Sequence, residues 1–340
     1  MFDKIVTLWD GSTLAHRVLA HTRVLARAYQ ADVTLLHVLE PQEKSDTGRL
    51  DTVNWHLRKI EAQSSLNAVA QEWEDNDLRL KTELLEGHAA NRIIEYIDKS
   101  DPDLIMLSSH GQSGLSPWNV NSVAHKVIGR AYRSLMLVRA YGQQCEDRDA
   151  KQYRRIVVPL DGSKRAECVL PFASRLAADQ GAELVLVHAL VPPTMMQTHT
   201  LTPEEVEIIE RLDRRNRETA KRYLTETAVQ IKLETVTELL SGANTVDVLL
   251  EFAANNEIDL IVMSAHGRAS DTMRPYGSVA SSFIDYGSTS LLVIQDLPQD
   301  QIKPTQAEIH ANSDDADTGR MNRKNAYAQP ANWSADLHLR

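Results

Sequence analysis

The chain has 340 residues, of which 42% are hydrophobic and 25% charged, a balance typical of soluble globular proteins and sufficient for two domains. Lys and Arg number 37 against 47 Asp and Glu, giving a formal net charge of −10, which argues against a protein that holds nucleic acid by neutralising phosphates. The two cysteines, Cys145 and Cys168, lack ligand-like spacing, so the sequence predicts neither a disulfide framework nor a zinc site.

The first residues run directly into a short apolar segment, without the pattern of a signal peptide. No apolar run approaches the roughly 20 residues that a membrane-spanning helix needs. We therefore expect a cytoplasmic protein that does not insert into membranes.

The first half alternates short apolar runs, rich in β-branched residues, with amphipathic stretches. Leu14, Val18 and Leu25 follow one another at helical spacing after the first run. Such alternation predicts parallel strands joined by helices, which lie on both faces of the sheet. We expect five strands, starting near Lys4, Asp32, Leu78, Asp103 and Ser134.

The second half repeats the first. The segment from Lys4 to Ser12 matches that from Arg155 to Ser163, and Asp103 to Gly111 matches Asp259 to Gly267. The period is far too long for a solenoid and indicates domain duplication. The corresponding strands should start near Arg155, Glu183, Ile231, Asp259 and Thr289.

The composition also divides the chain. We expect a first domain over residues 1–140, a linker over 141–153, a second domain over 154–296 and a polar tail over 297–340 that contributes little to folding. Two charge-rich helical stretches, 51–73 and 203–228, are either solvated helix faces or surfaces where partners dock.

Polar residues follow the first and fourth expected strands of each half. Asp10 and Asp161 close the first strands, and the loops from Ser108 to Gly111 and from Ser264 to Gly267 close the fourth. If these strands are neighbours, a carboxylate that can accept ribose hydroxyls faces a glycine loop whose N–H groups suit phosphate. An aspartate before glycine is equally typical of a turn or a helix cap, and that alternative stays open.

Several other chemistries find no support. No dinucleotide fingerprint follows the first strand, and the chain has no P-loop. The Gly111–Gly114 stretch resembles a nucleophile elbow but lacks the glycine two residues after the serine. Four histidines recur between the halves without a Cys or carboxylate that would complete a metal site, and they are His37, His110, His188 and His266.

The repeated strands, strand-end aspartates and loops together resemble the universal stress protein family. Members of that family carry Gly-x2-Gly-x9-Gly-Ser/Thr after the fourth strand, and this loop binds ATP in some of them. The second half has Ser264 and Gly267, then nine residues, then Gly277 and Ser278.

The first half has Ser108 and Gly111, then nine residues, then Asn121 and Ser122. Serine replaces the leading glycine in both halves, and the first half also lacks the third glycine. The resemblance therefore implies a tandem protein that binds an adenine nucleotide (ATP, ADP or AMP, with or without Mg) mainly in its second half.

The family's site residues carry over by position. Asp10 and Asp161 would approach the ribose, and Val38 and Ala189 the adenine. The loops would line the phosphates through Gly111, Ser122, Ser264, His266, Gly267, Gly277 and Ser278.

The resemblance implies a regulator of stress responses that is non-catalytic or at most weakly hydrolytic. One alternative is a nucleotide-free interaction protein of the same fold, and another is a nucleotide-dependent enzyme, although no base, nucleophile and oxyanion site converge. Family members pair through the fifth strand, so the runs 134–138 and 289–294 should meet within the chain. A homodimer and an unknown protein partner complete the expected partners.

Overall fold

The computed structural model of the chain describes residues 1–12, 16–41, 52–74, 78–109, 120, 122–139, 152–192, 202–268 and 274–296. Most of the expected linker and the whole of the expected tail lie outside these residues. So do Cys145, His110, Gly111 and Asn121.

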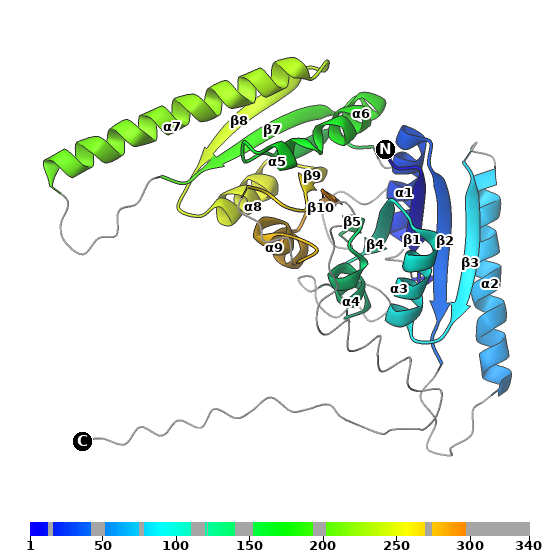
Figure 1. Cartoon of the computed structure of the whole chain (residues 1–340). Helices are drawn as coiled ribbons and strands as arrows, with labels where there is room; N and C mark the ends of the chain where they lie inside the picture. The colour runs from blue at the N-terminus through cyan, green and yellow to red at the C-terminus, as the bar shows by residue number, and fades with distance from the viewer. Residues whose placement is uncertain are drawn as a thin grey trace, which may run out of the picture.

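Both halves build one continuous sheet with the strand order β3-β2-β1-β4-β5-β10-β9-β6-β7-β8 (Figure 1). The first half supplies β1 (Lys4–Leu8), β2 (Asp32–Leu39), β3 (Leu80–Glu86), β4 (Leu104–Ser108) and β5 (Ser134–Val138). The second supplies β6 (Arg155–Pro159), β7 (Glu183–Leu190), β8 (Thr235–Ser241), β9 (Leu260–Ser264) and β10 (Ser290–Ile294). Pairing is parallel within each half, as predicted.

The halves join through β5 and β10, which pair antiparallel with Leu292 opposite Met136. This confirms the predicted meeting of the two fifth strands. The two halves therefore form one sheet and not two separate ones. Each of β5 and β10 would otherwise be an edge strand whose backbone groups could pair with other chains.

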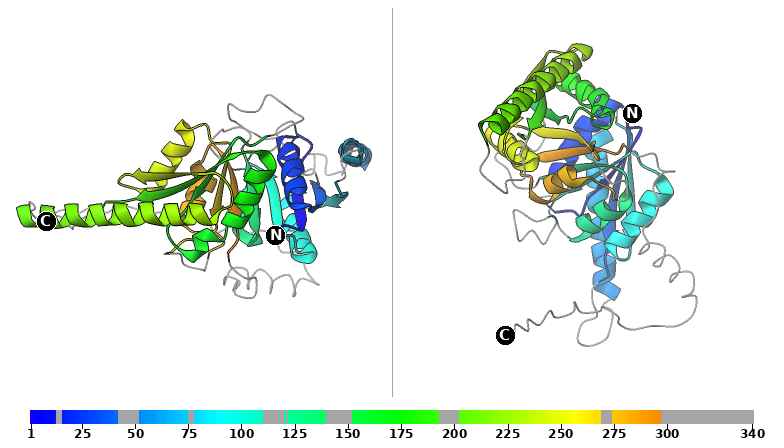
Figure 2. Two further views of the ribbon diagram at one scale, coloured as in Figure 1. Left: turned by 90° about the horizontal axis from the view of Figure 1, so that it is seen from above. Right: turned by 60° about the vertical axis from the view of Figure 1, so that its left-hand side comes forward.

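Helices cover both faces of the sheet (Figures 1 and 2). One face carries α1 (His16–Tyr29), α2 (Thr52–Glu74), α5 (Lys164–Glu167), α6 (Leu170–Gln180) and α7 (Pro203–Gln230). The other carries α3 (Ala89–Ser100), α4 (Ser122–Ala131), α8 (Thr245–Asn255) and α9 (Ser278–Tyr286). Successive strand residues serve opposite faces: Ile5 belongs to the first core and Val6 to the second, as the period of a strand requires.

Local sequence explains where elements begin and end. Thr202 and Glu205 form a reciprocal capping box that starts α7, with Pro203 in its first turn. That helix runs to Gln230, and the Ile231 N–H bonds to the Ala228 carbonyl. The strand expected near Ile231 therefore begins only at Thr235.

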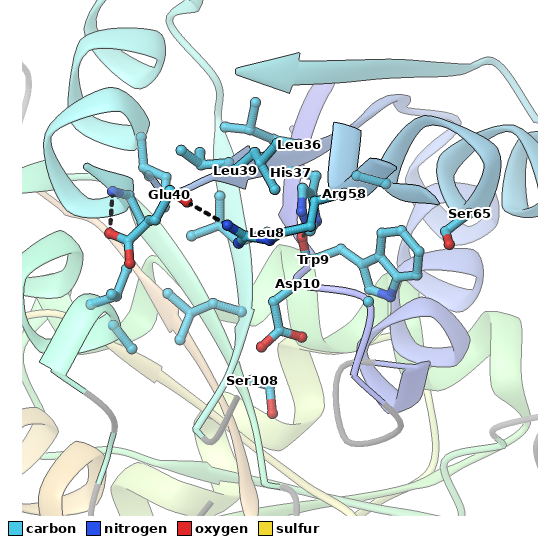
Figure 3. Close-up of a pocket in the computed structure, with 18 of the residues that line it drawn as sticks. Leu8, Trp9, Asp10, Leu36, His37, Leu39, Glu40, Arg58, Ser65 and Ser108 are labelled. Carbon is cyan, nitrogen blue, oxygen red and sulfur yellow. Dashed lines mark hydrogen bonds between the residues drawn. The ribbon is translucent and has the colours of Figure 1, made fainter. Parts of the chain in front are cut away.

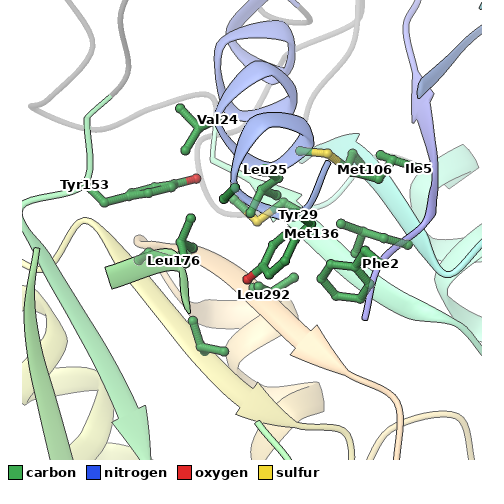
Figure 4. Close-up of a cluster of buried hydrophobic side chains, with 14 of the residues drawn as sticks. Phe2, Ile5, Val24, Leu25, Tyr29, Met106, Met136, Tyr153, Leu176 and Leu292 are labelled. Carbon is green, nitrogen blue, oxygen red and sulfur yellow. The ribbon is translucent and has the colours of Figure 1, made fainter. Parts of the chain in front are cut away.

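The first core continues across the junction between the halves (Figure 4). The ring centroids of Phe2 and Phe172 lie 4.8 Å apart, and the Tyr29 hydroxyl donates to the Phe172 carbonyl at 2.9 Å. On the other face, the buried Arg139 guanidinium donates to the carbonyls of Phe283 and Ile284 at the end of α9. Apolar packing and buried hydrogen bonds thus fasten one half to the other.

The two charge-rich stretches form α2 and α7, the longest helices described. Because each runs antiparallel to the strands, its N-terminal end lies at the carboxyl edge of the sheet and extends past the neighbouring strands (Figure 1). Apolar side chains are exposed on these ends, including Val53 and Leu57 on α2 and Ile208 on α7. The N-terminal part of each helix therefore extends beyond the carboxyl edge of the sheet.

Candidate functional site

The strand order places the expected site residues at a switch point in each half. From β1 the chain continues to β2 and β3 on one side, and β4 and β5 lie on the other. β1 pairs directly with β4, and β6 with β9. The condition for a carboxylate and a loop to share one crevice is therefore met twice.

Both strand-end aspartates form the same turn. Asp10 Oδ1 accepts from the Ser12 N–H at 3.0 Å, and Asp161 Oδ1 accepts from the Ser163 N–H at 2.9 Å. Between them Gly11 and Gly162 both have φ of 77°, which favours glycine. Asp10 and Asp161 therefore do stabilise a turn, which was one of the two roles that the sequence left open. The turn holds both carboxylates at the edge of the sheet.

In the second half the loop after β9 closes onto this carboxylate. Asp161 Oδ2 accepts from the Arg268 N–H at 2.6 Å, and a Cβ at Gly267 would lie 2.4 Å from the same oxygen. The Arg268 guanidinium lies beside Gly162, since a Cβ there would be 3.0 Å from its Nη2. Gly267 therefore allows the close approach, and Arg268 brings positive charge to the carboxylate.

The charges at these edges follow from their partners. Burial acts to raise the pKa of Asp161, but hydrogen bonds from Ser163 and Arg268 outweigh it and hold the pKa below its usual value. Burial lowers the pKa of His37 and of His188, which lie at the ends of β2 and β7. Asp161 is therefore a carboxylate and both histidines are neutral at pH 7.

His266 lies in the loop after β9, and its side chain is buried, with only 1% of the residue exposed. Its Nδ1 lies 2.7 Å from Asp296 Oδ1 and its Nε2 lies 2.8 Å from the Arg274 carbonyl oxygen. Arg165 Nε donates to the other Asp296 oxygen at 2.5 Å. This network ties the loop to α5 and to the end of β10, so His266 faces the protein interior.

Replacing Asp296 with Asn should destabilise the chain by about 1–3 kcal/mol at pH 7, because one carboxylate oxygen becomes an NH2 donor, so either His266 or Arg165 loses its acceptor, and the negative charge is removed. Burial acts to raise the pKa of Asp296, but His266 and Arg165 hold it below its ordinary value of 3.8. Because the Asp296 pKa is lower in the folded chain than in the unfolded chain, the ionised carboxylate stabilises the folded state at pH values above the unfolded pKa. This stabilisation is lost as the pH falls through the folded-state pKa.

The measurement is urea denaturation of both proteins between pH 7 and pH 3. The difference between native chain and variant should shrink below about pH 4. Asp285→Asn, a more exposed acid in α9, serves as the control and should stay within about 0.5 kcal/mol. A difference that does not change with pH would contradict this role for Asp296.

The remaining second-half residues lie at the same edge. Gly277 is the N-cap of α9, with its N–H bonded to the Ala265 carbonyl at 2.8 Å, and Ser278 is exposed as the first residue of the helix. Ala189 lies near the end of β7. Ser264 instead donates to the His266 carbonyl at 2.7 Å and so shapes the loop from within.

In the first half the expected residues surround a cavity of about 540 Å³ (Figure 3). Asp10, Val38 and Ser122 all line it, whereas Gly111 lies outside the described residues. Apolar side chains form much of its wall, most of them from the core on the α3 and α4 face of the sheet: Leu8, Leu36, Leu39, Ile93, Leu107 and Val123.

Sequence reasoning did not place three charged residues in this cavity. Glu40 follows β2, and Arg58 and Glu61 come from the overhanging end of α2. Arg58 Nη1 donates to the Glu40 carbonyl at 3.2 Å, and the Glu40 carboxylate accepts from the Ala89 N–H at 2.7 Å. The only sequence feature that pointed to Arg58 and Glu61 was the charge-rich stretch in which they lie, and such a stretch is equally typical of a helix face exposed to solvent.

Within the described residues, no group of three or more His, Cys, Asp or Glu side chains could hold a metal ion. Across the same part of the chain, none of the helices combines the length and apolar character required to cross a bilayer.

Comparison with known proteins assigns the fold to a family. The model of the Universal stress protein family matches residues 1–139 and 152–295. Universal stress protein MJ0531 of Methanocaldococcus jannaschii is 30% identical over 146 residues, which are 41% of this chain and 83% of that protein.

Two solved structures resemble this fold over most of the chain. The functionally unknown protein PA1789 from Pseudomonas aeruginosa PAO1 has a TM-score of 0.60 and 15% identity, covering 93% of this chain and 97% of its own. A universal stress protein from Archaeoglobus fulgidus has a TM-score of 0.59 and 18% identity, covering 86% and 98%. These likenesses show the fold, and because the two family matches together span well over half of the sequence, the chain belongs to the universal stress protein family.

Proposed function

We propose that the chain is a stress-response regulator that binds an adenine nucleotide, ATP, ADP or AMP, mainly in its second half. The observation that carries this proposal is the loop after β9, which bonds the Arg268 N–H to Asp161 and holds the Arg268 guanidinium beside Gly162. Positive charge and N–H groups in a loop that leads into a helix are suited to phosphate.

Each second-half residue then has a role. Asp161 accepts three hydrogen bonds from Ser163 and Arg268, which leaves about one of its four acceptor positions for a ribose hydroxyl. Ala189 would lie against the adenine. Gly277 and Ser278 would face the phosphates at the positive end of the α9 dipole.

The same arrangement favours binding over turnover. His188 is neutral because burial lowers its pKa, and the Ser163 hydroxyl at this edge donates to Asp161 and not to a histidine base. We therefore expect slow hydrolysis at most, with Mg held by the phosphates.

A second candidate is a nucleotide-free interaction protein. The observation in its favour is that the loop itself already satisfies most of the Asp161 carboxylate. If Asp161 bonds only to Ser163 and Arg268, its role would be to stabilise the loop after β9, and that loop would be part of a surface that binds a protein partner.

Placing aspartate at Gly277 should remove most ATP and ADP binding, because a carboxylate at the start of α9 repels phosphate and opposes the helix dipole. Asn121→Asp, the equivalent change in the first half, is the matched control and should leave most binding intact. Titration calorimetry on both full-length variants measures this.

Equal losses in the two variants would show two equivalent sites. Absence of binding to the unmodified protein, together with no nucleotide released on denaturing the purified chain in a mass spectrometer, would favour the interaction protein.

A further inference from the structure

We infer that the N-terminal end of α7, residues 203–217 (the α7 arm), is a surface at which two copies of this chain associate, with their α7 helices antiparallel. The α7 arm extends past the sheet, exposes apolar side chains and carries charges that are complementary to those of a second, inverted copy. Association at this surface does not depend on the nucleotide proposed for the second half.

The α7 arm extends past the end of the strand beside it. Arg217 Nη1 donates to the Ser241 hydroxyl at 3.0 Å, and Ser241 is the last residue of β8. The residues of α7 that are buried against the sheet, Ala220, Leu224 and Thr227, all follow this contact in the sequence. The N-terminal end of α7 projects beyond β8 in Figure 1. Among the described residues, the α7 arm therefore buries no side chain of its own.

The α7 arm nevertheless exposes large apolar side chains. Val206, Ile208 and Leu212 are 39%, 49% and 42% exposed. Ile208 and Leu212 are one helical turn apart and so lie next to each other on the helix surface. Because most helical stability in proteins comes from packing an apolar face, a partner that covers these side chains would stabilise the α7 arm.

The charges of the α7 arm divide into an acidic and a basic segment. Residues 203–210 contain four Glu and neither Lys nor Arg, and residues 211–217 contain four Arg and one Asp. Two copies side by side in parallel would bring the acidic segments together. Two antiparallel copies instead place each acidic segment against the basic segment of the other. The charge pattern therefore favours a second copy of the same helix, related by a two-fold axis.

The spacing of the residues gives the register of this pair. Four of them follow one another at intervals of four, three and four positions and so share one helix face: Glu204, Ile208, Arg211 and Arg215. Antiparallel packing of this face places Glu204 of each copy opposite Arg215 of the other. Ile208 then lies beside Leu212 of the second copy. Within the described chain neither Glu204 nor Arg215 forms an ion pair, so both charges are available to the second copy.

The corresponding helix of the first half does not have this charge pattern. The N-terminal end of α2 also exposes apolar side chains, but its formal charges are those of Arg58, Lys59 and Glu61. Arg58 donates to the Glu40 carbonyl and Lys59 donates to the Glu86 carboxylate, both within the same half. Pairing α2 with a second α2 would therefore bring no comparable opposite charges together, and the inference concerns α7 alone.

The first test is sedimentation equilibrium of the full chain over a range of protein concentrations. We expect a reversible dimer with a dissociation constant on the order of 10 μM, because the α7 arm offers only about 15 residues, roughly 22 Å of helix. Ile208→Ser should weaken association at least about ten-fold, because each dimer loses two apolar contacts. Val229→Ser is the matched control, since Val229 is 79% exposed on the same helix but outside the α7 arm, and it should leave association unchanged.

A charge exchange then tests the register. Glu204→Arg and Arg215→Glu each place like charges opposite one another, so each should weaken self-association about ten-fold. Mixing these two variants should restore association, because each then meets the opposite charge on the other. Circular dichroism of each variant checks that α7 stays helical, and a helix that was merely less stable would not recover on mixing.

Three outcomes would each overturn the inference. One is a chain that stays monomeric up to roughly 100 μM, since a specific pair of this kind should form below that concentration. Another is a dimer that Ile208→Ser leaves intact, because the copies would then associate through a different surface. The third is a mixture of Glu204→Arg and Arg215→Glu that associates no more tightly than either variant alone.

Discussion

Replacing Leu292 with Asp should remove most of the stability of the whole chain. Leu292 is fully buried in β10, opposite Met136 of β5, in the core that both halves share. The change loses about 2–5 kcal/mol of buried apolar contact and adds about 1–3 kcal/mol for an unpaired polar group. Domains of this kind are stable by only about 5–15 kcal/mol.

The measurement is urea denaturation combined with hydrogen exchange of the amides in β4 and β5. Protection should fall in the first half although the substitution lies in the second, because the sheet is continuous across the β5–β10 pair. Leu292→Met, which conserves volume, is the control and should cost less than about 1.5 kcal/mol. Unchanged protection of β4 and β5 in Leu292→Asp would mean that the halves fold independently.

The parts of this fold that the sequence predicted depend on local patterns. Runs such as 156–158 and 291–294 are apolar at every position, which is typical of a strand covered by helices on both sides. The pairing of β5 with β10 came from the family resemblance, and the apolar character of both runs agreed with it. Repetition of Asp-Gly-Ser after each first strand located both switch points.

The parts that were missed depend on side chains that meet from distant elements. His266, Asp296 and Arg165 are separated by 30 and 131 residues along the chain, and no periodicity joins them. Glu61 lies in the cavity because α2 overhangs the edge of the sheet, and helix register alone does not reveal that. The sequence therefore predicted the edge of the sheet at which we propose that ligands bind, but not the charged side chains that lie there.

Replacing Gly267 with Ala should damage the second-half site, although alanine is the smallest side chain available. A Cβ at this position would lie 2.4 Å from Asp161 Oδ2 and 3.4 Å from its Cγ. Either the loop or the carboxylate must move, and the hydrogen bond from the Arg268 N–H to that oxygen is lost. We expect a destabilisation of about 1–3 kcal/mol and at least a ten-fold loss of ATP affinity.

A double-mutant cycle with Asp161→Ala identifies the cause. Without the Asp161 carboxylate the clash disappears, so Gly267→Ala should hardly change the free energy of unfolding in the Asp161→Ala background. The coupling energy between the two positions should therefore be nearly as large as the effect of Gly267→Ala alone. Gly129→Ala in α4 is the control: nothing lies within 4 Å of a Cβ there, and alanine in a helix should stabilise the chain by up to about 1 kcal/mol. If Gly267→Ala costs as much without the Asp161 carboxylate as with it, the glycine is required for another reason. The loop would then owe its position to the His266–Asp296 network and not to the carboxylate at the end of β6.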